Sequence, residues 1–264
     1  MNPSTPTALI TGASAGIGAA FARHLAAEGY ALLLVARRAE RLEALADELA
    51  REHGVHCETL AADLTDPAAS QKIIHYANDE KGLEIEVLIN NAGLSRNRSF
   101  ADAPWEELAG EIQLMITAVT ELAHRVLPGM RARGRGYILN LSSIAAFVPP
   151  PKSLLYTAIK RYVLDMSQAL DMELKPQGIH VTALCPGFTY SEFHDVMGTR
   201  EDANRLPGFL WQQPEDVVRE GWNAVVKGRP VCVPGAVNKF IGGTVRPLPV
   251  RLQYYLGRSL NPFQ

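Results

Sequence analysis

The sequence contains few cysteines, almost no net charge and no long apolar run. Its three cysteines, Cys57, Cys185 and Cys232, are odd in number and far apart, so they predict neither a disulfide framework nor a CxxC metal pair. A formal net charge of -2 provides no electrostatic reason to expect nucleic acid as a partner. No stretch approaches the roughly 20 apolar residues of a membrane span.

The first residues also lack the features of a secretory signal. Met1–Thr7 has neither a basic start nor an apolar run. A chain of 264 residues buries roughly three quarters of its unfolded surface, so its core requires no metal or disulfide. We therefore expect a cytoplasmic protein that binds no structural metal.

Short apolar segments alternate with amphipathic ones along the chain. Within Arg41–Leu49, for example, Leu42, Leu45 and Leu49 recur at helical spacing. The alternation predicts an α/β fold: a single Rossmann-type, doubly wound domain over residues 1–264, with a seven-stranded, mostly parallel sheet and helices on both faces. The predicted strands are Ala8–Thr11, Ala31–Ala36, His56–Leu60, Val87–Asn90, Gly136–Leu141, His180–Leu184 and Pro230–Val233. Binding sites of such sheets lie beyond the carboxyl ends of the strands.

The C-terminal tail, about residues 236–264, mixes apolar with basic side chains. Phe240, Tyr254 and Tyr255 alternate there with arginines. This mixture is compatible with a helix on a membrane surface, or with a tail packed over a binding pocket or a second subunit. Because Pro247 and Pro249 interrupt any long helix, we favour the packed tail.

A glycine-rich segment directly follows the first predicted strand. Its glycines are Gly12, Gly16 and Gly18. Glycines permit a tight turn and let backbone amides approach a phosphate, and the start of the next helix adds unpaired amides and a positive dipole end. An ordinary turn is the alternative, but the position at the first strand–helix junction favours a dinucleotide site.

The spacing Gly12-x-x-x-Gly16-x-Gly18 resembles that of the short-chain dehydrogenase/reductase family, and further motifs in the family's order extend the resemblance from about Thr7 to Gly235. The resemblance implies an oxidoreductase that binds a nicotinamide dinucleotide and commonly forms homodimers or homotetramers. The cofactor-binding residues implied are Gly12, Ser14, Ala15, Gly16, Ile17, Gly18, Arg37, Arg38, Asp63, Leu64, Asn91, Ala92, Gly93, Tyr156, Lys160, Pro186, Gly187 and Thr189.

The end of the second predicted strand indicates which dinucleotide binds. An acidic residue there would accept hydrogen bonds from a free ribose 2′-hydroxyl, but Arg37 and Arg38 follow Ala36 instead. Guanidinium groups bind phosphate in a fork, so the sequence favours NADP(H), with Arg37 as the first candidate contact and Arg38 as the second. Asp63 matches the family's adenine-binding aspartate, and a helix cap is its alternative role.

Two further motifs of the family surround the expected nicotinamide site. Asn90-Asn91-Ala92-Gly93 ends the fourth strand, where Asn90 is expected to tie neighbouring strands together. After the sixth strand, Pro186 and Gly187 resemble the family's bend around the nicotinamide, and Thr189 is placed to bond the carboxamide. Cys185 is interpreted as a packed thiol, because no histidine partner is suggested.

Tyr156 and Lys160 carry the strongest chemical signal. Four residues apart, they lie on one helix face. An ammonium stabilises a phenolate and thereby lowers a phenol pKa of about 10, which suits Tyr156 for acid–base catalysis. Ser143 ends the fifth strand and matches the family's serine, which bonds the substrate oxygen. The adjacent Ser142 is expected to point in a different direction.

One position departs from the family's pattern. Relative to Leu127-Pro128-Gly129-Met130, the family's fourth catalytic residue, an asparagine that opens the helix and holds a water for the lysine, is replaced by Met115. A thioether donates no hydrogen bond. Either the proton path is rerouted in a working enzyme, which we favour, or turnover is impaired.

The substrate-binding residues are predicted from the resemblance to the family and from the position of apolar residues. The family places a substrate lid after the sixth strand, here about residues 189–210. The candidate substrate-pocket residues are Ser143, Phe147, Phe188, Phe193 and Met197, which favour a ketone or aldehyde with an apolar body. Three hypotheses stay open: a carbonyl reductase, a catalytically weak NADPH-binding regulator or scaffold, and a reductase of imines or other polarised double bonds.

Overall fold

The computed structural model describes residues 5–94, 100–147, 154–192 and 207–245, together with 248–249, 251–252 and 254–255. Its centre is a seven-stranded sheet in the order β3-β2-β1-β4-β5-β6-β7, with every neighbouring pair parallel. The strands are β1 (Thr7–Thr11), β2 (Ala31–Ala36), β3 (Cys57–Ala61), β4 (Ile85–Asn90), β5 (Gly136–Leu141), β6 (Ile179–Leu184) and β7 (Val231–Cys232). The predicted doubly wound fold is confirmed, the predicted bounds of β2 and β5 match the structure, and the ends of the other strands differ by at most two residues.

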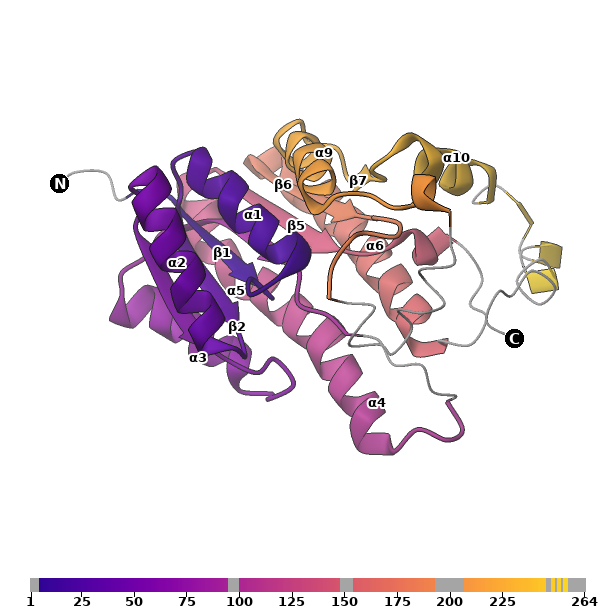
Figure 1. The fold of residues 1–264 in the computed structure, drawn as a ribbon, viewed down its shortest axis with the longest axis horizontal. Helices are drawn as coiled ribbons and strands as arrows, with labels where there is room; N and C mark the ends of the chain where they lie inside the picture. The colour runs from indigo at the N-terminus through magenta and orange to yellow at the C-terminus, as the bar shows by residue number, and fades with distance from the viewer. Residues whose placement is uncertain are drawn as a thin grey trace.

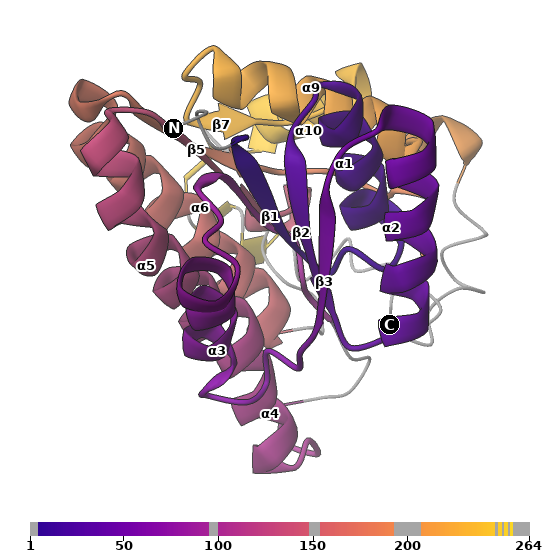
Figure 2. The same ribbon diagram turned by 90° about the vertical axis from the view of Figure 1, so that its left-hand side faces the viewer.

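Helices cover both faces of this sheet (Figure 1), and Figure 2 shows α1 and α2 on one side and α3, α5 and α6 on the other. The first layer consists of α1 (Gly16–Ala27), α2 (Ala39–His53) and α9 (Pro214–Val226). The second consists of α3 (Ala69–His75), α5 (Ala118–Arg133) and α6 (Leu154–Leu174). Shorter helical segments are η1 (Tyr76–Glu80), α4 (Trp105–Ile112), η2 (Gln113–Thr117), η3 (Ile144–Phe147), η4 (Lys175–Gln177), η5 (Gly208–Leu210) and α10 (Ala236–Val245).

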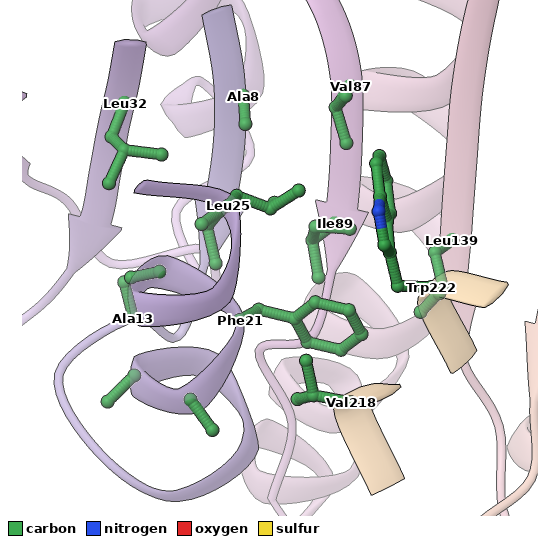
Figure 3. Close-up of a cluster of buried hydrophobic side chains, with 14 of the residues drawn as sticks. Ala8, Ala13, Phe21, Leu25, Leu32, Val87, Ile89, Leu139, Val218 and Trp222 are labelled. Carbon is green, nitrogen blue, oxygen red and sulfur yellow. The ribbon is translucent and has the colours of Figure 1, made fainter. Parts of the chain in front are cut away.

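The central strands consist mainly of apolar residues because both of their faces are covered. Every residue of β1 and β4 is buried. Successive side chains of a strand point to opposite faces, so Ile10 packs in the α1–α2–α9 layer and Leu9 in the α3–α5–α6 layer. In the first of these layers, Phe21 of α1 and Trp222 of α9 pack over Ile89 and Leu139 (Figure 3). Helix α1 is thereby held against the sheet at the switch point, the place between β1 and β4 where the strand order reverses.

A buried polar chain connects the strands beside that switch point. Asn90 of β4 donates from Nδ2 to Asn140 Oδ1 of β5 at 2.9 Å. Asn140 donates in turn to Ser167 Oγ of α6 at 3.0 Å. The expectation that Asn90 ties neighbouring strands together is confirmed, and the chain fixes the position of α6 relative to β5.

The first part of the C-terminal tail is a helix packed on the body of the protein. A Cβ added at Gly242 of α10 would lie 3.5 Å from Ile144 Cδ1 and 3.7 Å from Phe147 Cδ2 of η3. Asn238, which is 6% exposed, donates to Gln212 Oε1 at 2.8 Å. This part of the tail therefore packs over the segment that follows β5. Across the ranges that the structure describes, no helix is long and apolar enough to cross a bilayer.

Candidate active site

The glycine loop and the segment after β4 form one hydrogen-bonded unit at the carboxyl edge of the sheet. Thr11 Oγ1 accepts hydrogen bonds from the amides of Asn91 and Ala92, both at 3.0 Å. Asn91 Nδ2 donates to the carbonyl oxygens of Thr11 at 2.9 Å and Gly12 at 3.1 Å. Because β1 and β4 are neighbours, the two motifs that the sequence separates lie side by side.

The start of α1 has the features of an anion site. Its N-cap residue, Ala15, provides no side-chain hydrogen bond, and its first turn contains no acidic residue. By contrast, α9 carries Glu215 and Asp216 in its first turn. The first amides of α1 therefore lack a side-chain cap and have no acidic residue in their own helical turn, which suits the binding of a pyrophosphate.

The glycines of the loop are required by close backbone contacts. A Cβ at Gly18 would lie 2.2 Å from the carbonyl oxygen of Gly12. Gly12 itself has φ +66, and Gly16 has φ +56, in the left-handed region that glycine favours. The residues present thus fit the phosphates of a dinucleotide, because no side chain of the three glycines covers the backbone.

The structure brings Arg38 to the glycine loop. Its guanidinium donates to Ser14 Oγ from Nη2 at 3.0 Å and from Nε at 3.3 Å, and a third nitrogen pairs with Glu192 at 2.8 Å. Arg37 is exposed. Arg41 of α2 also pairs with Glu192, at 2.6 Å. Sequence reasoning missed Arg41 and Glu192, although the spacing of Arg38 and Arg41 at the start of a helix could have indicated the first of them.

Asp63 follows β3 and stabilises a turn. Its Oδ1 accepts hydrogen bonds from the amide of Thr65 at 2.9 Å and from Thr65 Oγ1 at 2.8 Å. Because α3 begins only at Ala69, this contact is a local turn and not a helix cap. The Leu64 side chain is buried in the core. An adenine contact at Asp63 stays a prediction.

Ser143, Tyr156 and Lys160 meet at the carboxyl end of β5. Tyr156 and Ser143 share a side-chain hydrogen bond. Lys160 Nζ lies 5.5 Å from the centre of the Tyr156 ring and donates to the carbonyl oxygen of Leu141 at 2.7 Å. Ser142 points elsewhere, as expected: its hydroxyl is buried and donates to the carbonyl oxygen of Lys160 at 2.6 Å.

Burial determines the pKa values of this pair. It raises the pKa of Tyr156 to about 12, and the hydrogen bond with Ser143 opposes that rise. It lowers the pKa of Lys160 to about 8. The expectation of a lowered tyrosine pKa, which considered only the nearby ammonium, is therefore wrong for the protein by itself. The removal of each charged form from water sets the direction of both pKa shifts.

Met115 is buried beside the same lysine. It is 1% exposed and lies in η2, a π-helical turn between α4 and α5. The ideal Cβ position of Gly93 is 3.6 Å from Met115 Sδ and 3.8 Å from Lys160 Nζ. The opening of the helix that the family associates with asparagine is present, but a thioether occupies the position of the amide.

The segment after β6 is held against Gln212 and α10. The Phe188 carbonyl oxygen accepts from the Gln212 amide at 2.9 Å, and the Tyr190 amide donates to the Gln212 carbonyl oxygen at 3.0 Å. A Cβ at Gly187 would lie 2.4 Å from Asn238 Oδ1. Asn238, which sequence reasoning missed, thus supports the Pro186–Gly187 bend. An asparagine at the start of the apolar part of the tail was the only available signal in the sequence.

The candidate substrate residues are only partly brought together. Phe147 is 5% exposed and packs in a core cluster with Leu164 and Ala183. Phe188 contacts Trp211, with ring centres 5.6 Å apart. Phe193 and Met197 lie outside the described residues. The part of the chain that the structure covers contains no group of three His, Cys, Asp or Glu side chains that could hold a metal ion.

A Rossmann-type sheet with an uncapped glycine-loop helix and a serine–tyrosine–lysine site defines a class of dinucleotide-dependent oxidoreductases. Residues 6–202 match the short chain dehydrogenase family, and the chain belongs to this family. The very-long-chain 3-oxoacyl-CoA reductase of Phaeosphaeria nodorum is 39% identical over 186 residues, which are 68% of this chain and 53% of that protein. The chain thus spans about half the length of that relative.

The similarity to other relatives extends over a larger share of their length. The human 17-beta-hydroxysteroid dehydrogenase type 3 is 32% identical over 228 residues, 85% of this chain and 70% of that protein. A short-chain dehydrogenase from Sphingobium yanoikuyae, solved in complex with NADPH, is 36% identical with a TM-score of 0.80, over 92% of this chain and 96% of that one. Relatives of this chain are therefore oxidoreductases, and at least one binds NADPH.

Proposed function

We propose that this protein is an NADPH-dependent oxidoreductase that interconverts a ketone or aldehyde and an alcohol. The observation that carries the proposal is the hydrogen-bonded pair of Ser143 and Tyr156, with Lys160 beside it, at the sheet edge that also carries the glycine loop. The phenol of Tyr156, whose pKa is raised, is protonated at neutral pH, so it holds the proton that reduction of a carbonyl consumes.

The bound cofactor supplies a hydride, and the chain's own residues manage the proton. Tyr156 donates its proton to the carbonyl oxygen of the substrate as that oxygen gains charge. Ser143 holds the same oxygen and stabilises its developing charge. Lys160, held by the carbonyl oxygen of Leu141, places a positive charge beside the Tyr156 ring and stabilises the phenolate that forms.

The choice of NADP(H) rests on the end of β2. No acidic residue follows that strand, and Arg38, with a side chain that is 44% exposed, bonds to Ser14 of the glycine loop. A guanidinium fork recognises a ribose 2′-phosphate. We now rank Arg38 ahead of Arg37 for this role, because only Arg38 has a hydrogen bond to the loop among the contacts of the described residues.

The substrate class follows from the apolar surroundings and from the names of relatives. Phe188, in the segment after β6, packs its ring against Trp211, and the same segment is bonded to Gln212. The names of two relatives describe a reductase of 3-oxoacyl-CoA and a hydroxysteroid dehydrogenase. Both names describe a ketone or a secondary alcohol on a large apolar body. We propose a ketone of that kind as the substrate of this chain.

NADPH consumption, with NADH in parallel, should show turnover of bulky apolar ketones that is at least about tenfold more efficient with NADPH.

Arg38→Ala should lower kcat/KM with NADPH by about 10- to 100-fold and leave NADH activity unchanged, because it removes a charged hydrogen bond that only the 2′-phosphate can use. Imines matched to the ketones belong in the same panel. Faster turnover of the imines would replace the carbonyl assignment.

Reduction is also expected to lose efficiency above about pH 8. The pKa of Lys160 is lowered to about 8, so its ammonium is present below that pH and lost above it. The measurement is kcat/KM for reduction between pH 6 and pH 10, and Lys160→Arg is the comparison, because an arginine stays charged over this whole range. A profile of Lys160→Arg that falls at the same pH as the native enzyme would remove Lys160 as the cause.

Met115 motivates the second candidate, an NADPH-binding regulator with weak turnover. If the thioether impairs the proton path, Met115→Asn should raise kcat by about tenfold or more without changing the Kd for NADPH, because an amide can hold a water beside Lys160. If the native enzyme already uses another path, kcat should stay within about twofold. Met115→Leu keeps the volume without polarity and is the matched control.

A further inference from the structure

Glu192 joins two arginines at the mouth of the glycine loop. One carboxylate oxygen lies 2.8 Å from Arg38 Nη1 and the other lies 2.6 Å from Arg41 Nη1. The two arginines hold the pKa of Glu192 below its usual range, so the carboxylate is charged at neutral pH. A cleft of about 510 Å³ opens beside this cluster, and Ser14, Gly16, Arg41, Glu192 and Glu215 are among its lining residues.

The segment that carries Glu192 lies on the glycine loop. A Cβ at Gly16 would be 2.9 Å from Ser191 Cβ. Tyr190 stacks on Trp211 with ring centres 4.8 Å apart and is bonded through its amide to Gln212. The segment from the Pro186–Gly187 bend to Glu192 therefore crosses the glycine loop, and Glu192 reaches α2 through its ion pair with Arg41. Its position results from backbone contacts and not only from its ion pairs.

The carboxylate of Glu192 is an oxygen anion, like the ribose 2′-phosphate that Arg38 is expected to bind. Carboxylate and phosphate oxygens occupy the same fork of a guanidinium group. The side chains of Arg38, Arg41 and Glu192 are 44%, 49% and 45% exposed. Exposed ion pairs are weak and exchange partners readily. The other cation of the cleft, Arg23, is already paired with Glu48 at 2.7 Å.

We propose that Glu192 determines cofactor specificity, because its carboxylate competes with the ribose 2′-phosphate of the dinucleotide for Arg38 and Arg41. A 2′-phosphate displaces the carboxylate, separates the 191–192 segment from α2 and takes over both guanidinium groups. A cofactor with a free 2′-hydroxyl leaves the ion pairs in place. The proposal rests on the NADP(H) assignment made above.

Calorimetric titration with two adenosine nucleotides tests the proposed competition by measuring affinity alone, independently of turnover. The probes are 2′,5′-ADP, which carries the 2′-phosphate, and 5′-AMP, which does not. Glu192→Gln should tighten 2′,5′-ADP by about three- to tenfold at low salt, since it removes a competing anion at two exposed ion pairs, and should leave 5′-AMP unchanged. Glu215→Gln removes the same charge from the same cleft but from no ion pair of Arg38 or Arg41, and should change neither affinity.

Three outcomes overturn the proposal, and they can be told apart. An unchanged or weakened affinity of Glu192→Gln for 2′,5′-ADP, in a protein that still prefers 2′,5′-ADP to 5′-AMP, overturns only the role of Glu192. Equal tightening by Glu215→Gln shows a general effect of charge in the cleft, which also removes Glu192 as a specific competitor. A native protein that binds the two fragments equally, with Arg38→Ala unchanged, overturns the NADP(H) assignment itself.

Discussion

Tyr156→Phe is expected to lower kcat about 10²- to 10⁴-fold while the Kd for NADPH stays within about twofold. The substitution removes only the hydroxyl, which shares a hydrogen bond with Ser143, and leaves the ring near Lys160. The measurements are single-turnover reduction of a bulky ketone and titration of NADPH fluorescence.

Tyr162→Phe is the matched control for this prediction. Tyr162 lies on the same helix, α6, and its hydroxyl bonds with Thr120 Oγ1 at 2.8 Å, away from the proposed acid. This variant should keep kcat within about twofold. Ready turnover by Tyr156→Phe would show that another group supplies the proton, and the proposed mechanism would then be wrong.

The second large effect is expected at Gly18. Gly18→Ala places a methyl group 2.2 Å from the carbonyl oxygen of Gly12, so either the loop or the start of α1 must shift. Such overpacking costs about 1–3 kcal/mol. Since the same backbone is expected to bind the phosphates, the Kd for NADPH should rise about 10- to 100-fold. Titration of NADPH fluorescence and thermal unfolding measure the two effects separately.

Two further variants keep this prediction testable. Gly243→Ala is the control, because a Cβ there has nothing within 4 Å, and it should leave NADPH binding unchanged. Ala15→Asp should cap α1 and raise the free energy of unfolding by about 0.5–1 kcal/mol, yet weaken NADPH through charge repulsion. Unchanged NADPH affinity in both Gly18→Ala and Ala15→Asp would place the phosphates elsewhere.

Much of this protein could be predicted from its sequence, because the signals are local. Strands such as β1 and β4 consist mainly of apolar residues, and the segments between the strands repeat apolar residues at helical spacing, so the sheet follows from short segments. The glycine loop occupies the single junction between β1 and α1, and Tyr156 and Lys160 lie one turn apart on a single helix, α6. Their order along the chain, together with the resemblance to the family, predicted that they belong to one site at the carboxyl edge of the sheet.

Only the tertiary structure decided which charged groups meet there and how burial changes them. Arg38 and Glu192 are 154 positions apart in the chain, and no local pattern predicts their contact. Whether Arg37 or Arg38 faces Ser14 depends on the turn after β2, which composition does not specify. The direction of the Tyr156 pKa shift depends on desolvation, which the surrounding elements produce together. Contacts of this kind join distant segments, so they exist only once the chain has folded.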